Sequence, residues 1–220
     1  RHVHAPRVNK VTERLNSLSP DIILLGGDYT NGSARRSERS SRELADIDAG
    51  HDALGRLEAP LGVFAVLGNH DYLYSPAAAQ TALEKGGITF VDNHAEIIGN
   101  RVCIFGFGDD YYGNPNRIGR DACPDGLPMS GLMHNPDSFE LAPGGEALMV
   151  AGHTHGGQIN IPGIGRRATS TRGGPKYAYG LMDIGGSPAF VTAGIGTSIL
   201  PARFRAPPEI VVITLQNNGS

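Results

Sequence analysis

Two histidines stand two positions apart in the segment Gly152-His153-Thr154-His155, directly after the apolar run 147–151. Imidazole is the commonest nitrogen ligand of divalent metals at neutral pH. A spacing of two does not place both rings on one face of an α-helix, which needs a spacing of three or four. On an irregular turn, both rings can point into one cavity. The pair therefore indicates either a metal site or a solvated turn, and other segments must decide between them.

Three other apolar runs also end in residues that can bind a metal. One run ends, after two glycines, at Asp28; a second ends at Asn69 and His70; a third and weaker run ends at His134. In open α/β sheets, ligands bind just beyond the carboxyl ends of the strands. Glycine at such a position lets the backbone turn sharply and approach a ligand closely. Four endings of this kind are hard to explain as ordinary turns, and together they predict a metal centre.

The motifs around these residues resemble those of the calcineurin-like metallophosphoesterases. They are GGDY at 26–29, GNHD at 68–71, MHNPD at 133–137 and GHTHGGQI at 152–159. The resemblance covers nearly the whole chain, and the nearest branch is a bacterial phosphodiesterase-like one with many membrane-associated members. It implies an α/β (α+β) fold of four layers, α/β/β/α, in which two mixed sheets stack with helices outside and the metal site at one edge.

The resemblance also implies a role for each polar residue. Asp28 would bridge two divalent ions, with Asn69, His134 and His153 on one ion and His155 on the other. Oxygen and nitrogen ligands without a thiolate suit Mn, Fe, Zn or Co. Two ions about 3.5–4 Å apart can neutralise a phosphoester, activate water and stabilise the leaving oxygen. We therefore expect a dinuclear centre that hydrolyses phosphoesters.

His70 follows the expected ligand Asn69 but is not itself expected to bind metal. It would give a hydrogen bond or a proton to the phosphate or the leaving group, as a general acid does. Asp71 would then orient the His70 ring and raise its basicity, or it would simply cap a turn.

The start of the chain departs from the family pattern. The family opens with a strand ending in Asp-x-His well before the GD motif, whereas Asp28 lies near the start of this chain. We therefore expect one domain over 1–220 that lacks the first strand and two ligands at its N-terminus. His2 or His4 could take their place. The segment 92–94, Asp-Asn-His, has the same spacing at the wrong place in the order, and we expect it to be a turn after a strand.

The composition is that of a globular protein. The chain has 220 residues, 40% hydrophobic and 19% charged, which is enough for one domain with a substantial core. The formal net charge of −3 offers no basic surface, so we expect no nucleic-acid partner. The 31 glycines and 15 prolines predict many loops, as suits a site assembled at strand ends. Cys103 and Cys123 lack the spacing of a zinc-thiolate site, and the sequence does not decide whether they pair.

Periodicity predicts helices that alternate with strands in the first half and more strands in the second. A polar stretch at 31–42 and two long segments at 109–128 and 156–179 are expected to be loops. We expect helices at 8–18, 44–57, 76–85 and 136–141, and strands at 22–26, 62–67, 88–91, 95–98, 101–107, 147–151, 188–193 and 209–215.

Several charged loop residues could line the pocket or simply face solvent. Asp109 and Asp110 could line the site or cap a helix. Four cations in the second long loop could contact an anionic substrate, because guanidinium and ammonium groups both bind phosphate; they are Arg166, Arg167, Arg172 and Lys176.

The leading functional prediction is a metal-dependent phosphodiesterase or phosphatase. The sequence does not choose between lipid-linked diesters, nucleotide-linked diesters and smaller phosphoesters as substrates. We expect a monomer that in its full-length form associates with a membrane surface or stays in the bacterial cytoplasm. The competing prediction is a catalytically impaired phosphate-binding or scaffolding protein on the same fold. The missing Asp-x-His motif favours that alternative, and it also predicts that this chain itself is a weak or inactive hydrolase.

Overall fold

The computed structural model describes residues 4–216 except 31, 143, 167–168 and 199. The α-helices are α1 (Ala5–Ser17), α2 (Ser41–Leu54), α3 (Asn69–Tyr74), α4 (Pro76–Lys85) and α5 (Ile118–Asp121), and the 3-10 helices are η1 (Arg36–Glu38), η2 (Pro136–Leu141), η3 (His155–Gly157) and η4 (Gly174–Tyr177). The strands are β1 (Ile23–Leu25), β2 (Val63–Ala65), β3 (Thr89–Phe90), β4 (Ala95–Ile98), β5 (Val102–Phe107), β6 (Met129–Met133), β7 (Leu148–Ala151), β8 (Asn160–Ile161), β9 (Gly165–Arg166), β10 (Gly180–Ile184) and β11 (Ser187–Val191).

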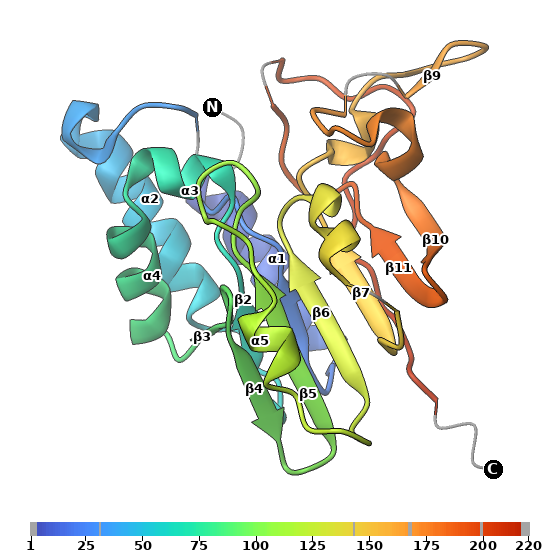
Figure 1. Ribbon diagram of the computed structural model, residues 1–220. Coiled ribbons are helices and arrows are strands. Elements are labelled where there is room, and N and C mark those ends of the chain that lie inside the picture. Colours follow the sequence, from blue (N-terminus) through green and yellow to red (C-terminus); the bar gives the residue numbers. More distant parts are fainter. Residues whose placement is uncertain (1–3, 31, 143, 167–168, 199, 217–220) are drawn as a thin grey trace.

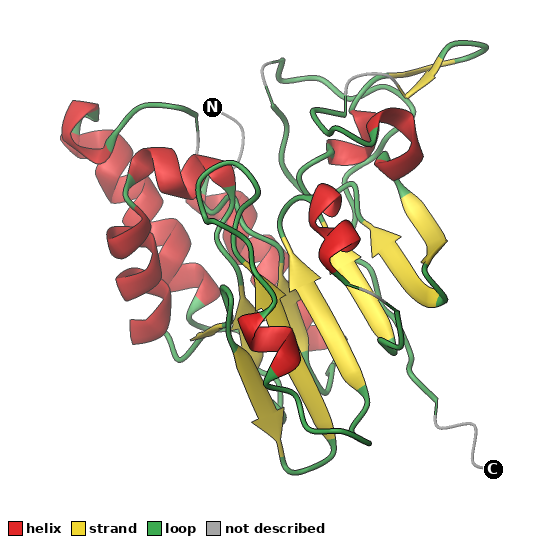
Figure 2. Ribbon diagram, viewed as in Figure 1, coloured by secondary structure: helices red, strands yellow, loops and turns green. Residues whose placement is uncertain are grey.

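Two sheets carry the fold (Figures 1 and 2). The small sheet has the order β1-β2-β3, and the large sheet has the order β10-β11-β7-β6-β5-β4. In the large sheet β5, β6, β7 and β11 run parallel, while β4 and β10 pair antiparallel at its edges. The predicted mixed sheet is therefore present here. The described strands of the small sheet are all parallel, which corrects the expectation that both sheets are mixed.

Alternating side chains along the strands form three apolar layers, because successive residues of a strand point to opposite faces. In β2, Val63 and Ala65 join Leu83 of α4 in the core beneath the helices. Phe64 of the same strand packs with Leu132 of the large sheet, in the core between the two sheets. The stacked sheets and the helices α1, α2 and α4 beside the small one supply three of the four expected layers (Figure 1).

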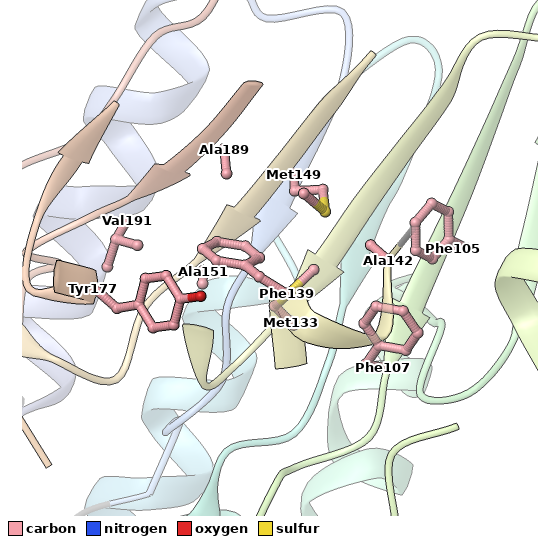
Figure 3. Close-up of a cluster of buried hydrophobic side chains, with 10 residues drawn as sticks. All are labelled: Phe105, Phe107, Met133, Phe139, Ala142, Met149, Ala151, Tyr177, Ala189 and Val191. Atoms are coloured by element: carbon pink, nitrogen blue, oxygen red, sulfur yellow. The ribbon is translucent and has the colours of Figure 1, made fainter. Parts of the chain in front are cut away.

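The outer face of the large sheet has a different cover. Phe105, Met133 and Met149 point to this face and are fully buried. Phe139 of η2 and Tyr177 of η4 pack over them, edge to face, with ring centroids 5.9 Å apart (Figure 3). The fourth layer therefore consists of short helices and loops, and the expected α/β/β/α order holds with this layer reduced.

The C-terminal segment departs from the predicted pattern. Residues 209–215 form a nearly continuous apolar run, as a buried strand would, yet the structure gives them no strand. Val212 and Leu215 are 68% and 54% exposed. An apolar run is a local property, whereas a strand needs a ladder of hydrogen bonds to a neighbour. Among the described residues, the structure gives this segment one backbone hydrogen bond, from the Glu209 amide to the Gly194 carbonyl at 3.1 Å. The open question of the two cysteines is answered: Cys103 of β5 and Cys123 after α5 form a disulfide.

Candidate metal centre

The predicted ligands lie where parallel strands of both sheets end. Asp28 follows β1 and Asn69 begins α3 after β2, while His134 follows β6 and His153 follows β7. The carboxyl ends of parallel strands meet at the same edge of a sheet. Since the two sheets are stacked, their carboxyl ends bring the four side chains to one place.

The four side chains converge on Nε2 of His134. This nitrogen lies 3.1 Å from Oδ1 of Asn69, 3.0 Å from Nδ1 of His153 and 3.5 Å from Oδ2 of Asp28. One ligand atom each from Asp28, His134 and His153 lies within 4.8 Å of the others, which is a spacing that can hold a metal ion.

Hydrogen bonds to backbone carbonyls favour the tautomers in which the two imidazoles present electron pairs to the cluster. Nδ1 of His134 lies 2.6 Å from the carbonyl of Gly26, and Nε2 of His153 lies 3.1 Å from the carbonyl of Ser170. A carbonyl oxygen accepts, so these nitrogens carry the protons and the opposite nitrogens present lone pairs. Together with the side-chain oxygens of Asp28 and Asn69, they form a group of four electron-pair donors. Such a group suits a divalent cation.

The pKa shifts of Asp28 and His153 favour the protonation states that bind a cation. Burial raises the pKa of Asp28, but the neighbouring His134 and His70 outweigh it and hold the pKa below its usual value. Burial and the nearby His134 lower the pKa of His153 to about 4. At neutral pH Asp28 is therefore a carboxylate and His153 a neutral imidazole, the protonation states that bind metal.

Backbone conformation is unusual at these positions. Asp28, His153 and His155 have φ values of 61°, 64° and 53°, in the left-handed region. Such conformations are uncommon for residues other than glycine and cluster at functional sites. Two glycines allow the close packing around the cluster: a Cβ on Gly68 would lie 2.2 Å from Oδ1 of Asp28, and a Cβ on Gly27 would lie 2.8 Å from Nδ1 of His134.

Asp71 holds the backbone of this region and does not orient His70 as proposed from the sequence. Its Oδ2 accepts from the backbone amides of Asp28 (2.8 Å) and Gly68 (2.9 Å). Its Oδ1 accepts from the amide and the hydroxyl of Thr30, at 3.0 and 3.1 Å. The side chain is fully buried. The alternative in which Asp71 caps a turn is therefore correct, and Asp71 also joins this turn to the segment that carries Asp28 and Thr30.

His70 is joined to the cluster through its backbone. Its amide donates to Oδ1 of Asp28 at 3.0 Å, and its Nδ1 lies 2.9 Å from the carbonyl of Gly32. The Gly32 carbonyl accepts a proton from Nδ1, which leaves Nε2 of His70 as the nitrogen that can exchange a proton with a ligand.

His155 lies close to the cluster without joining it. It is absent from the group of atoms within 4.8 Å, yet Asp28 and His134 both influence its pKa, which burial lowers. Its Nδ1 is buried and has no hydrogen-bond partner among the described residues. The guanidinium of Arg203 donates to the His155 carbonyl at 3.0 Å and so fixes this turn.

Other predicted candidates lie away from the cluster. Nδ1 of His4 pairs with Asp46 of α2 at 3.0 Å, so His4 is no substitute ligand. In the segment 92–94, Asp92 accepts from the amide of Leu67 at 3.0 Å and Asn93 holds neighbouring loops, as expected of a turn. His2 and Arg167 lie outside the described residues. Of the other loop cations, Arg166 stacks on Tyr179 and Lys176 lies over Tyr177.

The rim beside His153 is built by residues whose role the sequence did not assign. The hydroxyl of Tyr111 donates to the Ser170 carbonyl at 2.7 Å, the same oxygen that His153 contacts. Arg172 pairs with Asp110, with one contact at 3.0 Å. The amide of Arg172 donates to Asp137 at 2.7 Å. The loops around 110 and 170 are thus joined to each other over the imidazole.

Comparison with known proteins identifies the family of the chain. The family model described as calcineurin-like phosphoesterase matches residues 2–157. The chain belongs to this family. It is 31% identical to the metallophosphoesterase YkuE of Bacillus subtilis (strain 168), over 93% of this chain and 71% of the relative. It is 32% identical to phosphodiesterase YaeI of Escherichia coli (strain K12), over 89% of this chain and 70% of the relative.

Two more distant similarities add detail. The chain is 26% identical to UDP-2,3-diacylglucosamine pyrophosphatase LpxG of Chlamydia muridarum (strain MoPn / Nigg), over 94% of this chain and 77% of the relative. One solved structure aligns with 84% of each chain at a TM-score of 0.54 and 12% identity, which supports the fold alone. Among the described residues, no helix combines the length and apolar character needed to cross a membrane.

Proposed function

We propose that this chain hydrolyses phosphoesters, with phosphodiesters as the preferred class, at a dinuclear metal centre built around Asp28. The observation that supports the proposal most strongly is the convergence of Asp28, Asn69 and two histidine lone pairs on one point. Membership of the calcineurin-like phosphoesterase family supports the reaction class. The relatives named as phosphodiesterase and pyrophosphatase favour diesters and diphosphates over monoesters.

The residues of the chain have separate tasks in this reaction. Asp28, Asn69, His134 and His153 would hold one ion, and Asp28 with His155 would contribute to a second. Nitrogen and oxygen ligands of this kind suit Mn, Fe, Zn or Co. When bound, two such ions supply charge neutralisation and a hydroxide-like water. Gly27 and Gly68 let the two sheets approach closely enough for the shared site.

His70 is proposed as the general acid. Its amide fixes it beside Asp28, and the Gly32 carbonyl orients the ring so that Nε2 is available. A protonated Nε2 can give its proton to the oxygen of the departing alcohol. A positioned acid of this kind typically contributes a factor of about 10²–10⁴.

The test is hydrolysis of bis(p-nitrophenyl) phosphate by chelator-treated protein reloaded with Mn, Fe, Zn or Co in turn. We expect turnover that requires metal. His70→Ala should slow the hydrolysis of diesters with alkyl leaving groups by about 10²–10⁴ while metal content is kept, and should slow nitrophenyl esters less. His94→Ala, which removes an exposed histidine of a neighbouring turn, is the matched control. Metal binding without turnover would favour the phosphate-binding alternative.

A lipid-linked or nucleotide-linked substrate is part of this proposal. The name of LpxG states a nucleotide-linked, acylated substrate for that relative. Membrane-surface association and a monomeric state remain proposals for this chain, and sedimentation with anionic vesicles and light scattering would test them.

A further inference from the structure

Aromatic rings form a continuous row that starts at the donor cluster. The ring centroid of Tyr111 lies 5.7 Å from that of His153. Tyr112 follows at 6.3 Å from Tyr111, and Tyr72 follows at 6.4 Å from Tyr112. One end of this tyrosine row (Tyr111, Tyr112 and Tyr72) is thus beside a predicted metal ligand.

The first two rings are exposed although the chain has few aromatic residues. Tyr111 and Tyr112 are each 53% exposed, while aromatic residues make up 6% of the chain. Neighbouring exposed rings next to a polar site are unusual on a soluble surface and are typical of ligand-binding surfaces.

Hydrogen bonds fix the backbone and two of the hydroxyls of the tyrosine row. Asp109 is fully buried, and its Oδ1 accepts from the amides of Tyr111 and Tyr112 at 3.0 and 2.9 Å. The hydroxyl of Tyr111 is fixed on the Ser170 carbonyl, and that of Tyr72 contacts Asp92 at 3.3 Å. Rings that are ordered before binding lose little entropy when a ligand arrives.

The local charge is compatible with an anionic ligand. Asp110 lies between the buried Asp109 and Tyr111 in the chain, but Arg172 pairs with it. The exposed guanidinium of Arg172 therefore compensates the Asp110 carboxylate at this rim.

We propose that the tyrosine row stacks on a planar ring carried by the substrate, so that the preferred substrates are phosphoesters bearing an aromatic base, as nucleotides do. The inference rests on the proposed function only for the position of the phosphate at the donor cluster. Stacking of a base on an aromatic side chain changes binding by about 5- to 150-fold when the side chain is replaced by alanine.

A direct binding measurement tests the row independently of hydrolysis. The probes are thymidine 5′-monophosphate and 2-deoxyribose 5-phosphate, which share the phosphate and sugar and differ in the base. Calorimetry on metal-loaded protein should show that the nucleotide binds about 5- to 150-fold more tightly. In the double variant Tyr111→Ala/Tyr112→Ala this ratio should fall toward one, while the affinity for deoxyribose phosphate stays within about twofold.

Control variants separate the loss of the aromatic rings from the loss of the hydroxyls and from general effects of removing a tyrosine. Tyr111→Phe/Tyr112→Phe keeps both rings and should keep the ratio. Tyr179→Ala removes an exposed tyrosine outside the row and should also keep it. If the double alanine variant loses metal, the single variant Tyr112→Ala, which does not touch His153, decides.

The outcomes distinguish this inference from the proposed function. A ratio of one in the wild-type protein, or a ratio that survives the alanine substitutions, would overturn the role of the row. A base-dependent ratio in a protein that hydrolyses no phosphoester would support the row and refute the hydrolase. Hydrolysis of diesters without any preference for a base would support the hydrolase and refute the role of the tyrosine row.

Discussion

Asp28 and Asn69 lie on the small-sheet side, where buried contacts such as the one between Asp28 and Asp71, 43 residues apart, hold the backbone. His153 lies on the large-sheet side, where its ring contacts the backbone carbonyl of Ser170 in a loop. On the small-sheet side, Asp71 holds the backbone amide of Asp28, and Gly68 leaves no room for a side chain. On the large-sheet side, the Ser170 loop is joined to its neighbours by Tyr111 and Arg172, whose side chains are 53% and 66% exposed. The first arrangement rests on buried contacts, and the second rests in part on exposed side chains. The metal affinity should therefore depend more steeply on the small-sheet side.

The largest effect is expected for Asp28→Asn. This substitution keeps the shape of the side chain but removes the carboxylate shared by the donor cluster. Loss of an outer-shell partner alone costs about 10–100-fold in metal affinity, so loss of this ligand should cost more than about 100-fold. Equilibrium dialysis against Mn²⁺ or Zn²⁺ measures it. An affinity within tenfold of wild type would show that Asp28 does not bind the ion.

Two buried carboxylates give a matched test of the two sides. Asp71 and Asp137 each accept backbone amides, Asp71 on the small-sheet side and Asp137 from Arg172 and Gly173 on the other. Each change to asparagine should destabilise the fold by about 1–3 kcal/mol, because a buried donor loses its partner. Metal affinity should fall by about 10–100-fold for Asp71→Asn and by less for Asp137→Asn. Equal losses of affinity would contradict the difference between the sides.

A pH-dependent effect is expected at Asp92, which supports the turn between β2 and α3. Burial raises the pKa of Asp92 from 3.8 to about 7. The folded protein therefore holds this proton more tightly than the unfolded chain, and its contribution to stability is present below about pH 4 and lost as the pH rises to 7. In chelator-treated protein, Asp92→Asn should equal wild type near pH 4 and exceed it by about 1–3 kcal/mol at pH 8.

Urea unfolding at the two pH values measures this effect. The control is Asp125→Asn, which changes an exposed loop carboxylate. A difference between Asp92→Asn and wild type that is the same at both pH values would show that the proton on Asp92 is not the cause.

The smallest effect on metal affinity is expected for Arg172→Ala on the large-sheet side. The side chain of Arg172 is 66% exposed, whereas that of its partner Asp110 is 6% exposed. Because the substitution leaves the Asp110 carboxylate without this partner, stability should fall by about 1–3 kcal/mol, while metal affinity should barely change. A loss of affinity above tenfold would show that the loop position controls His153, and the contrast between the sides would then fail.

The predicted ligands could be found from the sequence because each follows its own apolar run. Asp28, Asn69, His134 and His153 all lie where a strand or its turn ends, and the strand pattern is local. The disulfide between Cys103 and Cys123 was one of two open alternatives, since pairing depends on the distance between two strand and loop positions.

The supporting contacts could not be found in this way. Asp71 reaches amides 41 and 43 residues away, and the partner of His153 is a backbone carbonyl, which every residue possesses. The helix α3 was missed because it has six residues and begins within the motif itself. The strand predicted at 209–215 was wrong because an apolar run alone does not provide a neighbouring strand.

Anomalous diffraction from crystals soaked in Mn²⁺ or Zn²⁺ tests the central claim most directly. We expect a metal peak about 2.0–2.2 Å from Nε2 of His134, Nδ1 of His153 and the side-chain oxygens of Asp28 and Asn69. A second peak should lie on the side of Asp28 that faces His155. A peak bound through the other nitrogens of the two histidines, or no peak among these four residues, would contradict the account.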